Sequence, residues 1–83
     1  MTTTTTVDPE LQRVIAELCD LDVGQVAPDV SLVTLGLDSV LMVELGVAIE
    51  ELFGVHLGEE DVVGLETVAD LDACVKRLQA AAR

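Results

Sequence analysis

The sequence predicts an all-α protein: a small antiparallel-type four-helix bundle with three longer helices, one short helix and a long first loop. Apolar residues recur at helical spacing in three separate stretches, and no stretch reads convincingly as a strand. Phe53 is the only aromatic residue, so the core must consist of Leu, Val, Ile and Ala, which pack readily between helices. The 83 residues suffice for one modest core but not for a deep active-site cleft as well.

The first helix is predicted mainly from its start. Residues 1–7 are rich in Thr and are expected to form a disordered tail, so that the folded domain comprises residues 8–83. Asp8 can cap the free amides of a helix, Pro9 suits its first position, and Glu10 complements the positive end of its dipole. One apolar helix stripe follows, formed by Leu11, Val14, Ile15 and Leu18.

Residues 24–38 form a long connection. Pro28 and Gly36 interrupt any regular helix in this segment. Loops of this length are usually functional or disordered, and a high apolar content argues against disorder. We therefore expect a loop that is pinned to the bundle by its apolar side chains, which are Val26, Val30, Leu32, Leu35 and Leu37.

The second helix is predicted over residues 39–53, with Asp38 as its cap. Gly46 costs about 1 kcal/mol relative to Ala inside a helix, which is tolerable if a neighbouring element packs closely there. The expected buried stripe comprises Met42, Leu45, Gly46, Ile49 and Phe53. The other side mixes aliphatic and acidic residues, namely Val40, Val43, Glu44, Val47, Glu50 and Glu51.

Two further helices are predicted in the last third of the chain. Residues 59–63 can form only a short helix before Gly64. Thr67 and Asp70 have the Thr-x-x-Asp spacing of a capping box, which indicates where the last helix begins. The apolar stripe of that helix comprises Val68, Leu71, Val75 and Leu78.

The charge of the chain is strongly one-sided. The net charge is −12, and no Lys or Arg lies between Arg13 and Lys76, where 14 of the 16 carboxylates are found. Nucleic acids and anionic membrane surfaces would repel such a protein. The charge instead favours basic protein partners, whose association it would accelerate at low salt.

Other features exclude several classes of protein. Cys19 and Cys74 are too few and too far apart for a disulfide framework or a zinc site, and we expect both as buried thiols on helix faces. No secretory signal, membrane span or metal site is predicted, so the expected location is the cytoplasm. A Ser-His catalytic pair is excluded because His56, the only histidine, is expected about 25 Å from Ser39 along the second helix.

Ser39 is the candidate functional residue. It lies at the start of the second predicted helix, where free amides and the helix dipole favour a phosphate. Asp38 can take the capping role, which leaves the Ser39 hydroxyl free to point outward. Leu37 and Val40 flank it with apolar contacts for a partner enzyme. The same helix presents an acidic strip formed by Glu44, Glu50 and Glu51.

These residues resemble the acyl carrier proteins. The resemblance lies in Gly-Leu-Asp-Ser-Val at 36–40, Val-Glu-Leu at 43–45 and Glu-Glu-Leu-Phe-Gly-Val at 50–55, and it extends over roughly residues 9–80. It implies that a phosphopantetheinyl transferase attaches a 4′-phosphopantetheine arm from coenzyme A to Ser39. The thiol of the arm would then carry acyl groups as thioesters between biosynthetic enzymes.

The resemblance also implies roles for the residues around Ser39. Asp38 would be its recognition partner. Leu45, Ile49 and Phe53 would be core residues that line or close the space in which an acyl chain is sheltered. Acyl-loading and chain-processing enzymes with basic docking surfaces would contact Leu37, Val40, Leu41, Val43, Glu44, Val47, Glu50 and Glu51.

The predicted function is that of a non-enzymatic, monomeric carrier in polyketide or fatty acid type biosynthesis. Val40 and Leu41 depart from the commonest form of the motif, which favours a specialised pathway over housekeeping fatty acid synthesis. A start at Met1 suggests a free-standing protein, although an excised domain with a new start would look the same. Two alternatives stay open: a carrier for aminoacyl or peptidyl groups, and an unmodified acidic module that docks on a basic partner through the second helix.

Overall fold

The protein is a bundle of four helices, as predicted. The computed structural model describes residues 7–81, and in this range its regular elements are helices, with one isolated bridge between Ser31 and Thr67. None of the helices in this range is long and apolar enough to cross a membrane. The elements are α1 (Pro9–Cys19), the short 3₁₀ turn η1 (Val23–Gln25), α2 (Ser39–Phe53), α3 (Glu59–Val62) and α4 (Val68–Ala81).

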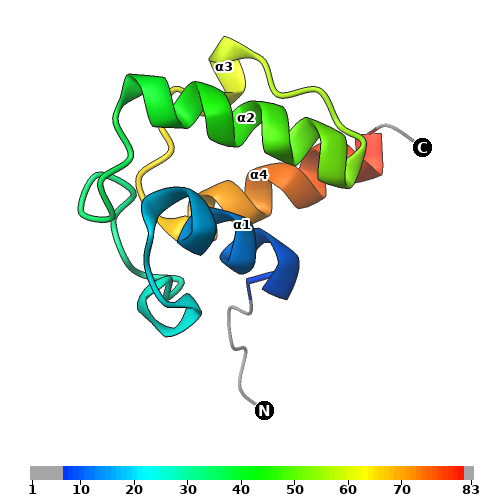
Figure 1. The fold of residues 1–83 in the computed structure, drawn as a ribbon. Coiled ribbons are helices and arrows are strands. Elements are labelled where there is room, and N and C mark those ends of the chain that lie inside the picture. The colour runs from blue at the N-terminus through cyan, green and yellow to red at the C-terminus, as the bar shows by residue number, and fades with distance from the viewer. Residues whose placement is uncertain (1–6, 82–83) are drawn as a thin grey trace.

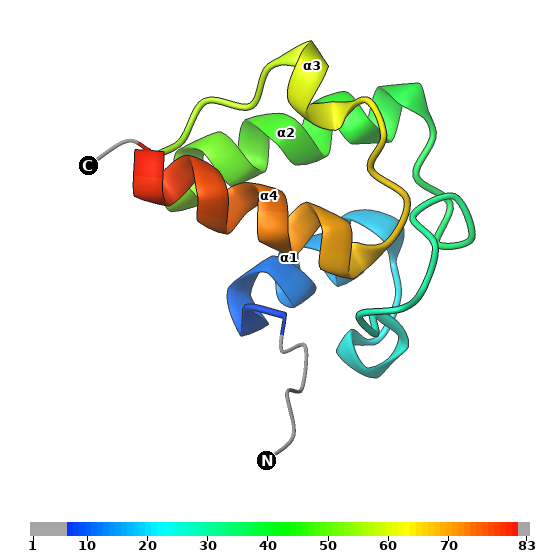
Figure 2. The same ribbon diagram turned by 180° about the vertical axis from the view of Figure 1, so that it is seen from behind.

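The helices do not all alternate in direction. α2 contacts both α1 and α4. In both views of the ribbon α1 runs opposite to α2, whereas α2 and α4 run in the same general direction (Figures 1 and 2). The chain between them, including α3, returns along α2 before α4 begins (Figure 2). The expected antiparallel arrangement is therefore correct for α1 and α2 and wrong for α2 and α4.

The core is aliphatic and comes from the predicted stripes of all three long helices. Phe53 and Met42 are half-buried at its edge. Val7 is also buried, so packing extends at least one residue before the predicted boundary at residue 8. Residues 1–6 of the predicted tail lie outside the described residues. The largest fully buried side chains are Leu11, Ile15, Val26, Leu45, Ile49, Val68, Leu71 and Cys74.

Local caps set the helix starts at the predicted places. The Asp8 side chain accepts a hydrogen bond from the second residue of α1. Asp38 does the same for α2, accepting from the Leu41 amide at 2.9 Å. Thr67 and Asp70 cap α4 reciprocally, each side chain accepting from the other residue's amide. Each pair lies within three residues along the chain, which is why sequence patterns reveal it.

A buried carboxylate joins the two ends of the fold. Asp72 on α4 is only 4% exposed. It accepts a hydrogen bond from the Asp8 amide at 3.0 Å and pairs with Lys76 Nζ at 2.7 Å. The contact holds the start of α1 against α4, and it was not foreseen because its partners are 64 positions apart.

Candidate functional site

Ser39 is exposed at the first position of α2. Asp38 takes the cap by accepting from the Leu41 amide, and the Ser39 hydroxyl forms no hydrogen bond with any described residue. The 15-residue helix behind it directs its positive end towards this point. The geometry therefore leaves a free hydroxyl where a phosphate group would be favoured.

The long loop before Ser39 is held in place by backbone pairing with the start of α4. The Leu32 amide donates to the Glu66 carbonyl at 2.9 Å, and the Val68 amide donates to the Val30 carbonyl at 3.1 Å. Val26 and Leu32 are buried, as the prediction of a pinned loop requires. Because this loop leads directly into α2, its anchoring also fixes the position of Ser39.

Gly36 makes the turn that delivers the chain to Asp38. Its φ of 97° lies in a region that residues with a side chain rarely adopt. The turn is closed by hydrogen bonds from the Gly36 amide to Val33 and from the Leu37 amide to Leu32. The glycine of the motif is thus required by the backbone conformation just before the site.

A groove of about 530 Å³ begins at Ser39 and runs between α2 and the segment that contains α3. Its polar lining consists of Ser39, Glu50 and Glu59. Leu45, Ile49 and Phe53, which were expected to line a shelter for an acyl chain, are not among its lining residues. Leu45 and Ile49 instead fill the core on the opposite side of α2. The apolar lining comprises Met42, Val43, Val47, Leu57, Val62 and Val63.

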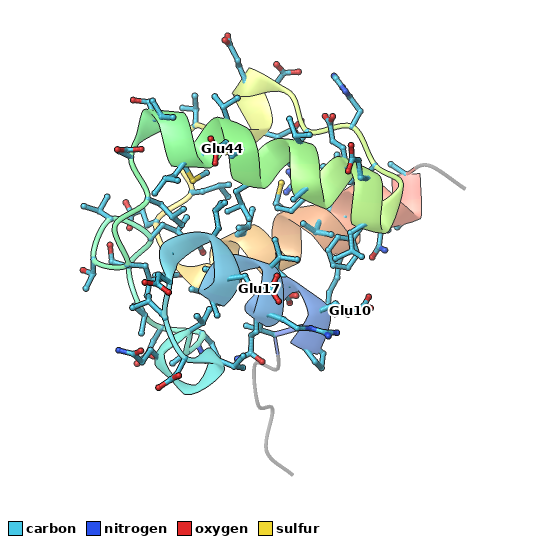
Figure 3. The ribbon with its side chains drawn as sticks, viewed as in Figure 1. Glu10, Glu17 and Glu44 are labelled. Atoms are coloured by element: carbon cyan, nitrogen blue, oxygen red, sulfur yellow. The ribbon has the colours of Figure 1, made fainter. Side chains whose placement is uncertain are left out.

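The outer face of α2 carries exposed aliphatic and acidic side chains together. Val40, Val43 and Val47 are each at least half exposed, and Glu44 and Glu51 are exposed between and beyond them. Figure 3 shows Glu44 on α2 above two further carboxylates of α1, which contacts α2. This α2 face, defined by the five residues named above, is the part of the predicted partner surface that the structure leaves accessible.

Three residues of the predicted partner surface are placed differently. Leu37 is 6% exposed and belongs to the core, which corrects its expected role as a surface contact. Leu41 is half-buried against the same core. Glu50 is half-buried, with its carboxylate engaged inside the molecule. The pattern placed all three near the surface because it cannot show which side chains the loop and α3 cover.

The Glu50 carboxylate holds the chain that follows α2. Its Oε2 accepts a hydrogen bond from the Leu57 amide at 2.8 Å and lies 3.1 Å from His56 Nδ1. The His56 side chain is 89% exposed. Because His56 follows the far end of α2 while Ser39 begins it, the two side chains do not form a catalytic pair.

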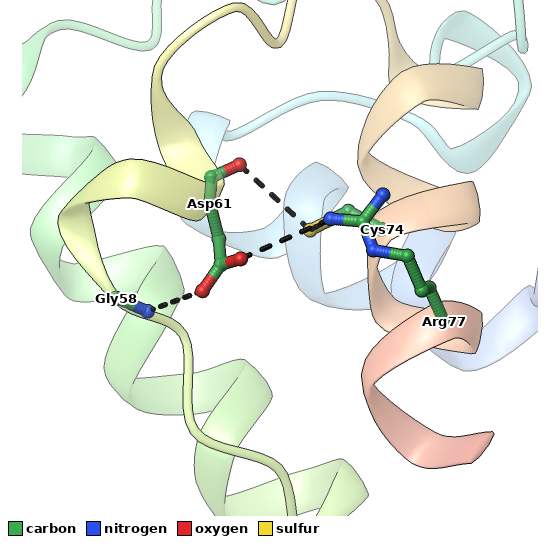
Figure 4. A network of polar contacts seen from close by, with 4 residues as sticks. All are labelled: Gly58, Asp61, Cys74 and Arg77. Carbon is green, nitrogen blue, oxygen red and sulfur yellow. Dashed lines mark hydrogen bonds and ion pairs between the residues drawn. The ribbon is translucent and has the colours of Figure 1, made fainter. Parts of the chain in front are cut away.

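A second polar cluster fastens α3 to α4 (Figure 4). The Asp61 carboxylate accepts from the Gly58 amide at 3.0 Å and lies 3.8 Å from Arg77 Nη2. The Cys74 thiol donates to the Asp61 carbonyl at 3.8 Å. The sequence shows no sign of this cluster, since its members come from two segments that are separated along the chain. It secures the wall that closes the groove opposite α2.

Both cysteines are free thiols. Cys74 is buried, as predicted, whereas Cys19 is only half-buried at the end of α1. Burial raises the pKa of each thiol, and in Cys74 the nearby Arg77 partly offsets this effect. Both side chains therefore serve the packing of helices, as expected from their positions.

Comparison with known proteins agrees with this geometry. The profile of a family described as "Phosphopantetheine attachment site" matches residues 9–75. The chain is 38% identical over 72 residues to the acyl carrier protein of Rhodococcus erythropolis, covering 86% of this chain and 79% of that protein. The chain is an acyl carrier protein family member. The cofactor of this family is 4′-phosphopantetheine.

Other acyl carrier proteins are similar over most of their length. The protein named acyl carrier protein MbtL of Mycolicibacterium paratuberculosis is 44% identical over 70 residues, which covers 83% of this chain and 79% of that protein. The meromycolate extension acyl carrier protein of Mycolicibacterium smegmatis is 37% identical over 70 residues, covering 83% and 71%. The predicted family is thus confirmed.

The residues around Ser39 fit the cofactor of the family. A phosphodiester needs an accessible hydroxyl, and Ser39 supplies one that no described residue uses. Its negative charge suits the start of a 15-residue helix. The groove that begins at Ser39 offers mainly aliphatic walls to an apolar group attached beyond the phosphate.

Proposed function

We propose that Ser39 is the residue that carries the 4′-phosphopantetheine arm, and that the protein acts as a non-catalytic carrier of acyl groups. The single observation that supports this most is the free hydroxyl of Ser39 at the start of α2, beside a cap already provided by Asp38. When bound, the arm supplies a terminal thiol that holds an acyl group as a thioester.

The attachment is a phosphoryl-type transfer in which Ser39 is the acceptor. Its Oγ forms a bond to phosphorus while the nucleotide part of coenzyme A leaves, and the hydroxyl proton passes to a base of the transferase. Within this chain, Asp38 keeps α2 capped and Gly36 sets the turn, so both act by positioning Ser39. The first-turn amides of α2 favour the phosphate through their dipoles.

The proposed docking surface for partner enzymes is the α2 face. Its three Val side chains offer apolar contact next to Ser39, and Glu44 and Glu51 offer charge. A net charge of −12 would steer the protein towards basic surfaces on the phosphopantetheinyl transferase and on acyl-loading and chain-processing enzymes. We leave Leu37 out of this surface because it is buried.

The proposed pathway is fatty acid or polyketide type synthesis, with specialised rather than housekeeping chemistry. Support comes from similarity to proteins named for meromycolate extension. The protein is proposed to work as a monomer in the cytoplasm. An aminoacyl carrier and an unmodified acidic module are the outcomes that the experiment below distinguishes.

The test is the intact mass of the protein after incubation with coenzyme A, magnesium and a broad-specificity phosphopantetheinyl transferase. We expect the parent to gain one phosphopantetheinyl group and Ser39→Ala to gain none. The substitution is at an exposed position, so its free energy of unfolding should stay within about 0.5 kcal/mol of the parent. A gain in both proteins would place the arm elsewhere.

Two controls complete the design. A known acyl carrier protein in the same tube shows that the transferase is active, so that an unmodified parent would favour the acidic interaction module. Loading of the modified protein is then compared between acyl and aminoacyl donors. Transfer of aminoacyl groups alone would replace the acyl carrier with an aminoacyl carrier.

A further inference from the structure

We infer that Gly46 is a specificity-determining residue of the groove, which keeps space for apolar acyl groups bulkier than a straight chain. The inference rests on the proposed function, because an acyl group reaches the groove only if Ser39 carries the arm. It concerns one position in the wall that α2 contributes.

The packing of the protein does not require a glycine at position 46. A Cβ built there would meet Leu57 Cδ2 at 3.7 Å, which is ordinary van der Waals contact. Leu57 does lie beside this point of α2, but at a distance that would admit a Cβ. A glycine inside a helix also destabilises it relative to alanine. The fold therefore tolerates Gly46 without gaining from it.

What the absent side chain leaves is room inside the groove. Gly46 belongs to the groove lining on α2, and Gly58, at the start of α3, belongs to the lining on the other side. Two of the six glycines of the chain thus line this one groove. A side chain at Gly46 would extend towards Leu57, another lining residue, and would narrow the groove. A Cβ at Gly58 would instead meet the carboxylates of Glu60 and Asp61, which do not line the groove. We therefore base the inference on Gly46. The groove is consequently wider beside Gly46 than it would be with an aliphatic side chain at that position.

The space is sufficient for a branch or a ring. An apolar cavity of about 150 Å³ holds a benzene molecule, and pockets for small ligands begin at about 300 Å³. The groove measures about 530 Å³ and its walls are mainly aliphatic. An acyl group on the arm is the occupant that fits best, because the groove begins at Ser39 itself.

Loaded protein allows a direct test. The transferase attaches acetyl-, octanoyl- or phenylbutanoyl-phosphopantetheine to the parent, Gly46→Ala and Gly46→Val, and the rate of thioester cleavage by hydroxylamine is measured. In the parent we expect octanoyl and phenylbutanoyl to be cleaved several-fold more slowly than acetyl. Gly46→Val should raise the phenylbutanoyl rate to that of acetyl while octanoyl stays protected. For Gly46→Ala, the rate of phenylbutanoyl cleavage should lie between those of the parent and Gly46→Val.

The unloaded protein provides a second readout. Gly46→Ala should raise Tm by as much as about 4–8 °C, since it restores helix propensity without a clash. Gly24→Ala is the matched control, because a Cβ at Gly24 meets nothing within 4 Å and lies outside the groove. It should leave the cleavage rates of all three acyl groups unchanged.

Several outcomes would overturn the inference. A lower Tm for Gly46→Ala would show that the fold needs this glycine. Equal effects of Gly46→Val on octanoyl and phenylbutanoyl, or no effect on either, would show that position 46 does not select bulk. A dimeric parent that becomes monomeric in Gly46→Val would assign the groove to a second copy of the chain. An unmodified parent would remove the proposed function and the inference together.

Discussion

The two longest helices use their apolar residues in opposite ways. α4 buries five of its 14 residues, and one of these is the carboxylate of Asp72. α2 is one residue longer and richer in aliphatic side chains, yet it buries only Leu45 and Ile49. Val40, Val43 and Val47 remain exposed on it. A helix that leaves so much apolar surface uncovered inside a small bundle is suited to contacts outside the molecule.

The carboxylates of the two helices differ in the same way. Asp70 and Asp72 of α4 accept hydrogen bonds from backbone amides, and Asp72 also pairs with Lys76. Glu44 and Glu51 of α2 are exposed and form no hydrogen bond or ion pair with a described residue. Substitutions on α4 should therefore change stability, whereas those on the α2 face should change interactions with partners.

The largest effect on stability is expected for substitutions at the buried residues of α4. Leu71 is fully buried, so Leu71→Ala should lower the free energy of unfolding by about 2–5 kcal/mol. The matched change on α2 is Val43→Ala, at a side chain that is 67% exposed, and it should cost no more than about 0.5 kcal/mol. Urea unfolding of both variants measures the two losses in the free energy of unfolding. Similar losses in both would remove the contrast between the helices.

Asp72 should give the next largest effect. Asp72→Ala leaves the Asp8 amide and Lys76 without this acceptor, which should cost about 1–3 kcal/mol in urea unfolding. Asp72→Asn retains an oxygen for the Asp8 amide and should lose less. If the Asn variant were as unstable as the Ala variant, the pairing with Lys76 would be the dominant contribution.

Glu50 lies on α2, yet its carboxylate accepts a hydrogen bond as those of Asp70 and Asp72 on α4 do. Glu50→Ala removes the acceptor for the Leu57 amide and should cost about 0.5–1.5 kcal/mol, with faster hydrogen exchange at that amide. Glu50→Gln keeps an acceptor and should exchange almost as the parent does. Glu51→Ala, one residue further along α2, is the control that should leave this exchange rate unchanged.

The hydrogen bonds of the Asp70 carboxylate predict that the stability of the protein depends on pH in the acidic range. Hydrogen bonds from the Thr67 and Glu66 amides lower the pKa of Asp70 below its ordinary 3.8. Because the folded pKa is the lower one, this contribution is complete above the unfolded value and is lost as pH falls through the folded value. Tm measured from pH 5 downward should therefore fall less steeply for Asp70→Ala than for the parent. A parallel course of the two curves would refute the prediction.

Glu44 should have the smallest effect on stability and a clear effect on partners. Glu44→Lys reverses an exposed charge, so its free energy of unfolding should stay within about 0.5 kcal/mol of the parent. Its modification by the transferase should be slower at low salt, and the difference should shrink as salt screens the charge. Kinetics equal to those of the parent at low salt would argue against docking through the α2 face.

Local interactions explain why so much of the fold follows from sequence. The starts of α1, α2 and α4 depend on Asp8, Asp38 and the Thr67–Asp70 pair, whose bonds span only a few residues. The apolar stripes repeat at the helical period, so their buried positions could also be predicted. The position of Ser39 at the start of α2 could be predicted for the same reason, since a helix start and its cap are local features.

Interactions between distant segments could not be predicted from local sequence patterns. The sequence by itself determined the helices, the capped start of α2 and the excess of acid. Only the tertiary structure decided that Leu37 is buried, that Glu50 holds Leu57, and that the groove lies on the α3 side of α2 rather than in the core. The reason is physical: a cap or a stripe is set by neighbours along the chain, whereas burial and pairing depend on which remote segment covers each face.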